Sequence, residues 1–156
     1  MKLKVSVAET GKPRSLMLDM IAQIKRGVEV RVGTAQGTHG ESGMSNDELA
    51  AIHEFGTEDG RVPERSFLRS TMKAQRKPWL DFLSARMKRV VAGKLPALVA
   101  LGQLGLKMSG DVKAAIVAGI DPSNAPSTVA AKGSDTPLID TGRLKESIMH
   151  EVVVKP

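Results

Sequence analysis

The feature that most constrains this chain is a helix that stops and restarts within residues 52–69, a segment that we call the joint. Apolar residues at helical spacing lead up to Gly56, which is expected to end the first helix as a left-handed cap. A polar, acidic turn follows at residues 58–60, and Pro63 sets the entry into a second, strongly basic helix. Because the joint lacks the groups that catalysis needs, we interpret it as a building element of the fold.

Three segments are predicted to be β-strands. Residues 2–7 and 28–33 alternate between apolar and polar side chains, which is typical of strands with one buried face. Residues 148–154 form the third predicted strand, near the C-terminus.

Apolar residues at helical spacing predict four helices, at residues 13–26, 47–55, 66–93 and 95–119. Pro78 lies inside the third, where it removes a backbone donor, so we expect a kink or a short break there. The two long helices are joined by only a few residues and should pack antiparallel.

The chain is expected to form one α+β domain over residues 1–156, with 41% hydrophobic and 26% charged residues. The predicted architecture is a small antiparallel sheet of three to four strands against two long helices, with one or two short helices. Residues 34–45 and 121–137 are polar loops without a periodic pattern, which we expect to become ordered on contact with a partner.

Caps are predicted at two further helix starts. Ser45 or Asn46 can cap the helix that begins at residue 47. A short helix or turn is expected in residues 140–147, where Asp140 or Thr141 supplies the cap and Gly142 eases the turn.

Several kinds of chemistry find no support in the sequence. The chain has no cysteine, which excludes disulfides and thiolate sites. His53 and Glu54 resemble the start of a zinc-protease motif, but Thr57 stands where the second histidine is required. Ser109 and Ser147 have no visible base partner. We therefore predict no catalytic residue, no metal site and no cofactor.

The sequence pattern also argues against several other classes of site. The glycine-containing loop at residues 33–40 lacks the Lys-Ser/Thr of a phosphate-binding loop. Aromatic residues make up only 3% of the chain, which argues against pockets for small molecules and against stacking surfaces for single-stranded nucleic acid. No stretch reaches the roughly 20 apolar residues of a membrane span, so we expect no membrane contact and synthesis in a cytoplasm.

The basic excess is concentrated in one segment. Residues 1–60 carry seven Lys/Arg against nine Asp/Glu, residues 61–94 carry ten against two, and residues 95–156 carry six against six. The middle segment is either the solvated face of an amphipathic helix or a surface for phosphates or an acidic partner. We expect Arg65 and Arg69 to begin this face, which continues through Lys73, Arg76 and Lys77.

Three motifs together resemble the tail-completion and neck family of tailed bacteriophages, small virion-morphogenesis proteins that join head and tail. They are "AAIHEFGT", "RVPERSFLRSTM" and "PLIDTGRLKESI", and the resemblance covers residues 48–72 and 108–148. The matching positions are Ala51, His53, Glu54, Phe55, Gly56, Thr57, Pro63, Arg65, Phe67, Leu68, Leu138, Ile139, Asp140, Thr141, Gly142, Leu144 and Ile148.

The resemblance implies a structural virion protein and not an enzyme. It implies a small α+β subunit of a homo-oligomeric ring, sixfold or twelvefold, at the neck or the end of the tail, which contacts neighbouring connector or tail-tube proteins. The matching residues are expected to shape the fold and its subunit contacts, and the basic segment to meet an acidic neighbour. The alternative is a protein that binds DNA non-specifically through that segment.

Overall fold

The structure is a computed structural model that describes residues 27–39, 43–133, 138 and 142–155. Its central element is an antiparallel pair of strands, β1 (Val28–Thr34) and β4 (Ile148–Val154), in register from Val28 opposite Val154 to Thr34 opposite Ile148. These strands confirm two of the three predicted ones. The strand predicted at residues 2–7 and the helix predicted at residues 13–26 lie outside the described residues.

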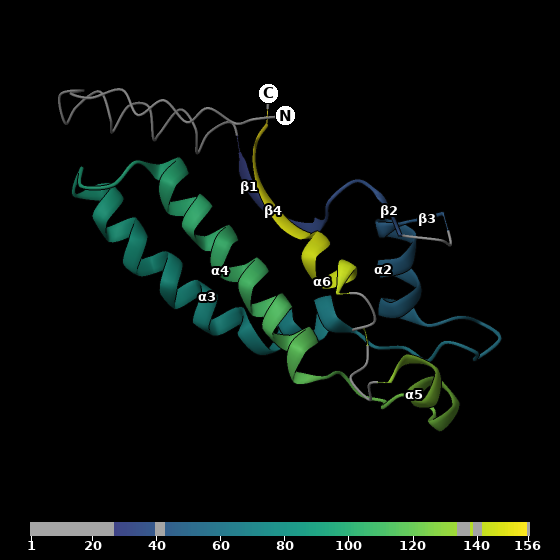
Figure 1. Ribbon diagram of the computed structural model, residues 1–156. Helices are drawn as coiled ribbons and strands as arrows, with labels where there is room; N and C mark the ends of the chain where they lie inside the picture. The colour runs from purple at the N-terminus through teal and green to yellow at the C-terminus, as the bar shows by residue number, and fades with distance from the viewer. Residues whose placement is uncertain (1–26, 40–42, 134–137, 139–141, 156) are drawn as a thin grey trace.

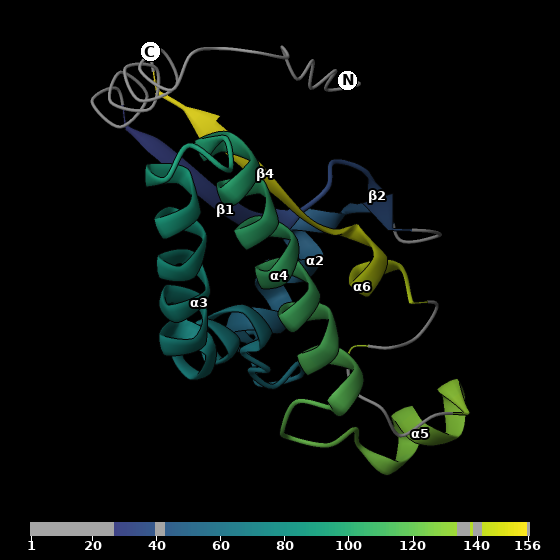
Figure 2. The ribbon, with the colours of Figure 1, turned by 90° about the vertical axis from the view of Figure 1, so that its left-hand side faces the viewer.

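Two long helices form an antiparallel pair beside this sheet (Figures 1 and 2). They are α3 (Phe67–Val91) and α4 (Ala97–Ala118), and α4 lies against both the sheet and α3. The fold is therefore mixed helix and strand, with a small two-stranded antiparallel sheet and several helices.

Helix α3 continues through Pro78, so the predicted break is wrong. Pro78 lies on the exposed side of the helix, as does Ala74, whose carbonyl would accept the hydrogen bond that proline cannot donate. Water can satisfy that carbonyl, which explains why the helix tolerates the proline.

Three short helices lie within the described residues: α2 (Asn46–Phe55), α5 (Pro126–Lys132) and α6 (Arg143–Ser147). The cap of α2 is Ser45, whose side chain accepts from the backbone of Glu48 while the Glu48 carboxylate accepts from the backbone of Ser45. The cap position of α6 is Gly142, with φ 79°, and neither Asp140 nor Thr141, which lie outside the described residues.

Both segments that were predicted to be loops contain regular structure. Residues 34–45 include the short antiparallel strands β2 (Thr38–His39) and β3 (Met44–Ser45). Helix α5 occupies part of residues 121–137, starting at Pro126 and ending at Gly133 in the left-handed conformation. The prediction missed this helix because its seven residues are too few to show a hydrophobic period.

The core lies where α4, the sheet and α6 meet. Its members share near-complete burial and come from separate elements of the chain: Ala50, Phe67, Val112, Ile116, Leu138, Leu144 and Ile148. Helix α4 approaches the sheet most closely at Gly105, where an added Cβ would stand 2.4 Å from His150 Cδ2 and 3.1 Å from Val30 Cγ1.

We predict that Gly105→Ala destabilises the fold by about 1–3 kcal/mol, because the new methyl group must displace the His150 ring. Gly102→Ala and Gly110→Ala are matched controls in the same helix, since nothing lies within 4 Å of a Cβ added at either position. Each control should stabilise α4 by up to about 1 kcal/mol. Chemical denaturation measures all three, and equal effects at the three positions would contradict this packing.

Candidate functional site

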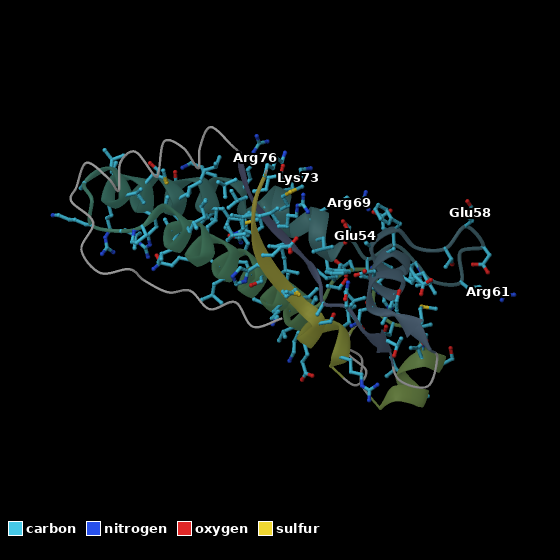
Figure 3. All side chains as sticks on the ribbon, turned by 90° about the horizontal axis from the view of Figure 1, so that it is seen from above. Glu54, Glu58, Arg61, Arg69, Lys73 and Arg76 are labelled. Atoms are coloured by element: carbon cyan, nitrogen blue, oxygen red, sulfur yellow. The ribbon has the colours of Figure 1, made fainter. Side chains whose placement is uncertain are left out.

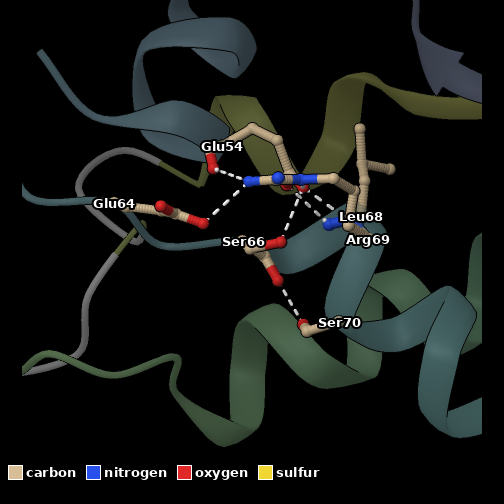
Figure 4. A network of polar contacts seen from close by, with 6 residues as sticks. All are labelled: Glu54, Glu64, Ser66, Leu68, Arg69 and Ser70. Carbon is tan, nitrogen blue, oxygen red and sulfur yellow. Dashed lines mark hydrogen bonds and ion pairs between the residues drawn. The ribbon is translucent and has the colours of Figure 1, made fainter.

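The joint is organised by a buried carboxylate at its start. Glu54, in the last turn of α2, is 3% exposed and accepts hydrogen bonds from Leu68 N at 2.8 Å, Arg69 N at 3.0 Å and Ser66 Oγ at 2.7 Å (Figure 4). Leu68 and Arg69 belong to the first turn of α3, whose N–H groups have no partner within the helix. The Ser66 side chain makes no cap bond, so Glu54 caps α3 from a different helix.

Arg69 completes this cap. Its guanidinium donates to Glu54 Oε1 at 2.9 Å, to the Glu54 carbonyl at 3.0 Å and to Glu64 Oε1 at 2.7 Å, and it lies 4.5 Å above the Phe55 ring. Burial raises the pKa of Glu54, but the hydrogen bonds from the backbone of Leu68 and Arg69 and from the Ser66 and Arg69 side chains lower it further, so the net pKa lies below the ordinary value. The charge of Arg69 is thus paired within the molecule, although its side chain is 49% exposed.

Arg65 fastens the joint to the loop after α4. Its side chain is buried and donates to the carbonyls of Pro122 at 2.8 Å and Ser123 at 3.1 Å, while its backbone N donates to the His53 carbonyl at 2.7 Å. The expectation that Arg65 begins an exposed basic face is therefore wrong. Main-chain carbonyl oxygens stabilise its buried positive charge.

The turn between α2 and α3 closes on itself around Gly56. Thr57 N donates to the Val62 carbonyl at 2.9 Å, and Val62 N donates to Thr57 Oγ1 at 3.0 Å. Gly56 has φ 73° and ψ −178°, so it needs a positive φ as predicted but is not the left-handed helical cap that was expected. A Cβ there would lie 2.8 Å from Glu64 N and 2.9 Å from Val62 O.

The remaining motif residues are divided between core and surface. Phe67 and Leu144 are buried in the same core cluster, and Leu68 packs against it. The structure therefore brings together the motifs near residues 52–69 and near residue 144, far apart in the chain. Phe55 is 62% exposed and Pro63 is half-buried.

Lys73, Arg76 and Lys77 are exposed on α3, and Figure 3 shows Lys73 and Arg76 beyond Arg69 along the helix. Trp79 of the same helix is buried, and its indole donates to Asp111 of α4 at 2.6 Å. Lys77 pairs with Asp81 at 2.8 Å. Met72 and Leu80 are each 56% exposed on the same helix. We call the surface formed by Met72, Lys73, Arg76, Lys77 and Leu80 the basic face. Its three cations lie among exposed apolar side chains.

One side-chain pair was not predicted from the sequence. Ser109 Oγ lies 3.4 Å from His150 Nδ1, between α4 and β4, and Ser109 is 5% exposed. Ser109 Oγ also donates to the Leu106 carbonyl at 3.1 Å. The two residues are 41 positions apart, so no local sequence pattern could have predicted the contact. Because the hydroxyl is buried, we interpret the contact as a structural link between α4 and the sheet.

Within the described ranges, no group of three or more His, Asp or Glu side chains could hold a metal ion. In the same part of the chain, no helix is both long and apolar enough to cross a bilayer. No protein-family profile, curated protein sequence or solved structure matches this chain. The function proposed below therefore rests on the residues and their geometry.

We predict that Gly56→Ala costs more stability than Gly60→Ala. Both glycines have a positive φ, at 73° and 70°, and Gly56, with ψ −178°, also lies in a region that is almost restricted to glycine. Only Gly56 faces backbone atoms as well, whereas nothing lies within 4 Å of a Cβ at Gly60. Urea unfolding of the two variants measures the difference, and equal losses would contradict the close approach at Gly56.

We also predict that Glu54→Gln destabilises the fold by about 2–4 kcal/mol near neutral pH, since an amide cannot serve all the donors that now converge on the carboxylate. The pKa of Glu54 is lowered from 4.5, so the ionised group stabilises the fold above that pH, and the stabilisation disappears as pH falls through the folded-state value.

Unfolding free energies measured against pH check this directly. The wild-type protein should lose stability below about pH 4.5, and the Glu54→Gln variant should lose less over the same range. Glu58→Gln, at an exposed position, is the control and should follow the wild type. Identical pH profiles for wild type and Glu54→Gln would refute the role of Glu54 as an ionised cap.

Proposed function

We propose that this chain is a structural virion protein of a tailed bacteriophage or prophage, a ring-forming neck or tail-completion component that joins head and tail. The observation that supports the proposal is that the motif residues have structural roles. Glu54, Gly56, Arg65 and Phe67 serve to fix α2, α3 and the loop after α4, which leaves the basic face as the exposed feature of the longest helix.

We propose a role without catalysis, metal or cofactor. Three charged groups of the joint are engaged within the molecule, since Glu54 pairs with Arg69 and Arg65 donates to main-chain carbonyls. Groups bound in this way are unavailable as acid, base or nucleophile. Their arrangement suits a rigid connector.

The chemistry of the basic face favours a protein partner. Phosphates would be bound by Lys73 and Arg76, but they would gain nothing from Met72 and Leu80, whose exposed side chains a protein surface could bury. We therefore propose that this face meets a neighbouring ring or subunit in the virion, and that the protein is present in the host cytoplasm during assembly.

Non-specific DNA binding is the alternative use of the same cations. Lys73, Arg76, Lys88 and Arg89 are all exposed on α3, and such a row attracts phosphates with a strong dependence on salt. A salt-dependent gel shift on random duplex separates the two uses, since sub-micromolar binding at physiological salt would favour DNA.

We also propose a third strand for the sheet that β1 and β4 form. A two-stranded sheet is marginal by itself, and both β1 and β4 lack a second strand neighbour among the described residues. We propose that residues 2–7, which alternate apolar and polar side chains, extend this sheet toward the three to four strands that the sequence predicts.

We predict that Lys73→Glu combined with Arg76→Glu abolishes head–tail joining while the chain folds normally, because both side chains are exposed. Arg69 is unsuitable for this test, since its reversal would break the cap of α3. Lys113→Glu combined with Lys145→Glu changes the net charge equally on α4 and α6 and serves as the control. Virion yield reports joining, circular dichroism reports folding, and a normal yield from the first variant would overturn the proposal.

A further inference from the structure

The molecule carries opposite charges on two different parts of its surface. Residues 46–64, which comprise α2 and the turn after it, hold six carboxylates and one arginine, a net charge of −5. Helix α3 holds seven cations and one carboxylate, a net charge of +6. We call residues 46–64 the acidic end.

Ion pairs within the molecule neutralise only some of these charges. Glu54 and Glu64 are bound to Arg69, and Lys77 is bound to Asp81. The acidic end still exposes Asp47, Glu48, Glu58 and Asp59, against a single cation, Arg61. Helix α3 still exposes Lys73, Arg76, Lys88 and Arg89.

Within one copy these two surfaces meet at the joint, through the ion pairs of Arg69 with Glu54 and Glu64. The turn that bears Glu58 lies at one extremity of the molecule, and α3 runs from the joint toward the other (Figures 1 and 3). Lys73 and Arg76 follow Arg69 on α3, and no ion pair joins them to a carboxylate of the described residues, so the exposed carboxylates of another copy are a natural counterpart for them.

Both surfaces also carry exposed apolar side chains, as the centre of a protein interface requires. Met72 and Leu80 lie among the cations of α3, and Phe55 is 62% exposed at the acidic end. Apolar contacts surrounded by complementary charges are the usual anatomy of a specific interface.

On the basis of the proposed ring, we infer that the basic face of α3 binds the acidic end of a second copy of this chain, head to tail. Such a contact joins two different surfaces, and contacts of this kind close into rings when the rotation between subunits permits. A symmetric contact through α3 would instead oppose two cationic helices, and juxtaposed like charges disfavour association.

The test uses two purified full-length variants with opposite charge changes. Lys73→Glu with Arg76→Glu lowers the net charge of α3 from +6 to +2, and Asp47→Lys with Glu58→Lys brings that of the acidic end from −5 to −1. In either variant alone most of the charge complementarity between the two surfaces is lost, so we expect self-association to weaken on the order of a hundredfold relative to wild type. Mixed in equal amounts, each variant offers the surface that the other has lost, and association should return.

Sedimentation velocity at high protein concentration reads out the assembly at about 0.1 M salt, where exposed charges still interact over about 10 Å. A matched control replaces the acidic-end variant in the mixture by Glu146→Lys with Glu151→Lys, which adds the same charge elsewhere and should not restore association. Circular dichroism verifies that every variant folds.

Three results would overturn the head-to-tail contact: a wild-type protein that stays monomeric, equal rescue by the acidic-end variant and the control, or a mixture that is not rescued. The proposed role at the neck is tested separately, by head–tail joining. If Lys73→Glu with Arg76→Glu loses joining but the mixture is not rescued, the basic face meets a different protein and the head-to-tail contact is wrong. If the mixture is rescued and joining is normal, the ring exists and the proposed role in the neck is wrong.

Discussion

The arrangement of this fold depends on one carboxylate, which lies in the last turn of one helix and caps the first turn of the next. Glu54 lies in α2 but accepts the backbone hydrogen bonds of the first turn of α3, so the two helices cannot change their relative angle without exposing buried N–H groups. Arg69 neutralises this carboxylate, and Arg65 attaches the same region to the loop after α4. The sheet, α4 and α6 are assembled around a joint that these three side chains hold.

The sequence predicted what short-range patterns encode. Strands β1 and β4, helices α2, α3 and α4, and the need for glycine at position 56 all follow from periodicity and capping. It could not predict which partner each arginine would find, because Arg65 meets a carbonyl 57 positions away. For the same reason the sequence could not show that Arg69, although exposed, is bound by a carboxylate 15 positions earlier.

The candidate site was predicted in part. The joint and the exposed cations Lys73, Arg76 and Lys77 are where the sequence places them. The apolar members of the basic face were not foreseen: Met72 fits the core stripe of α3 by its spacing, yet it is exposed. Spacing alone identifies an amphipathic helix but does not reveal which of its apolar residues the rest of the fold leaves uncovered.

The central claim is that the motif at the joint is architectural, with Glu54 as an ionised cap and no catalytic acid. An NMR pH titration of the Glu54 side-chain carboxyl carbon in the wild-type protein tests it without any substitution. An ionised cap predicts a midpoint below 4.5, since the converging donors favour the charged form. A midpoint above 4.5 would contradict the claim, because a carboxyl that is protonated more readily than usual is a poor cap for α3 and a plausible proton donor.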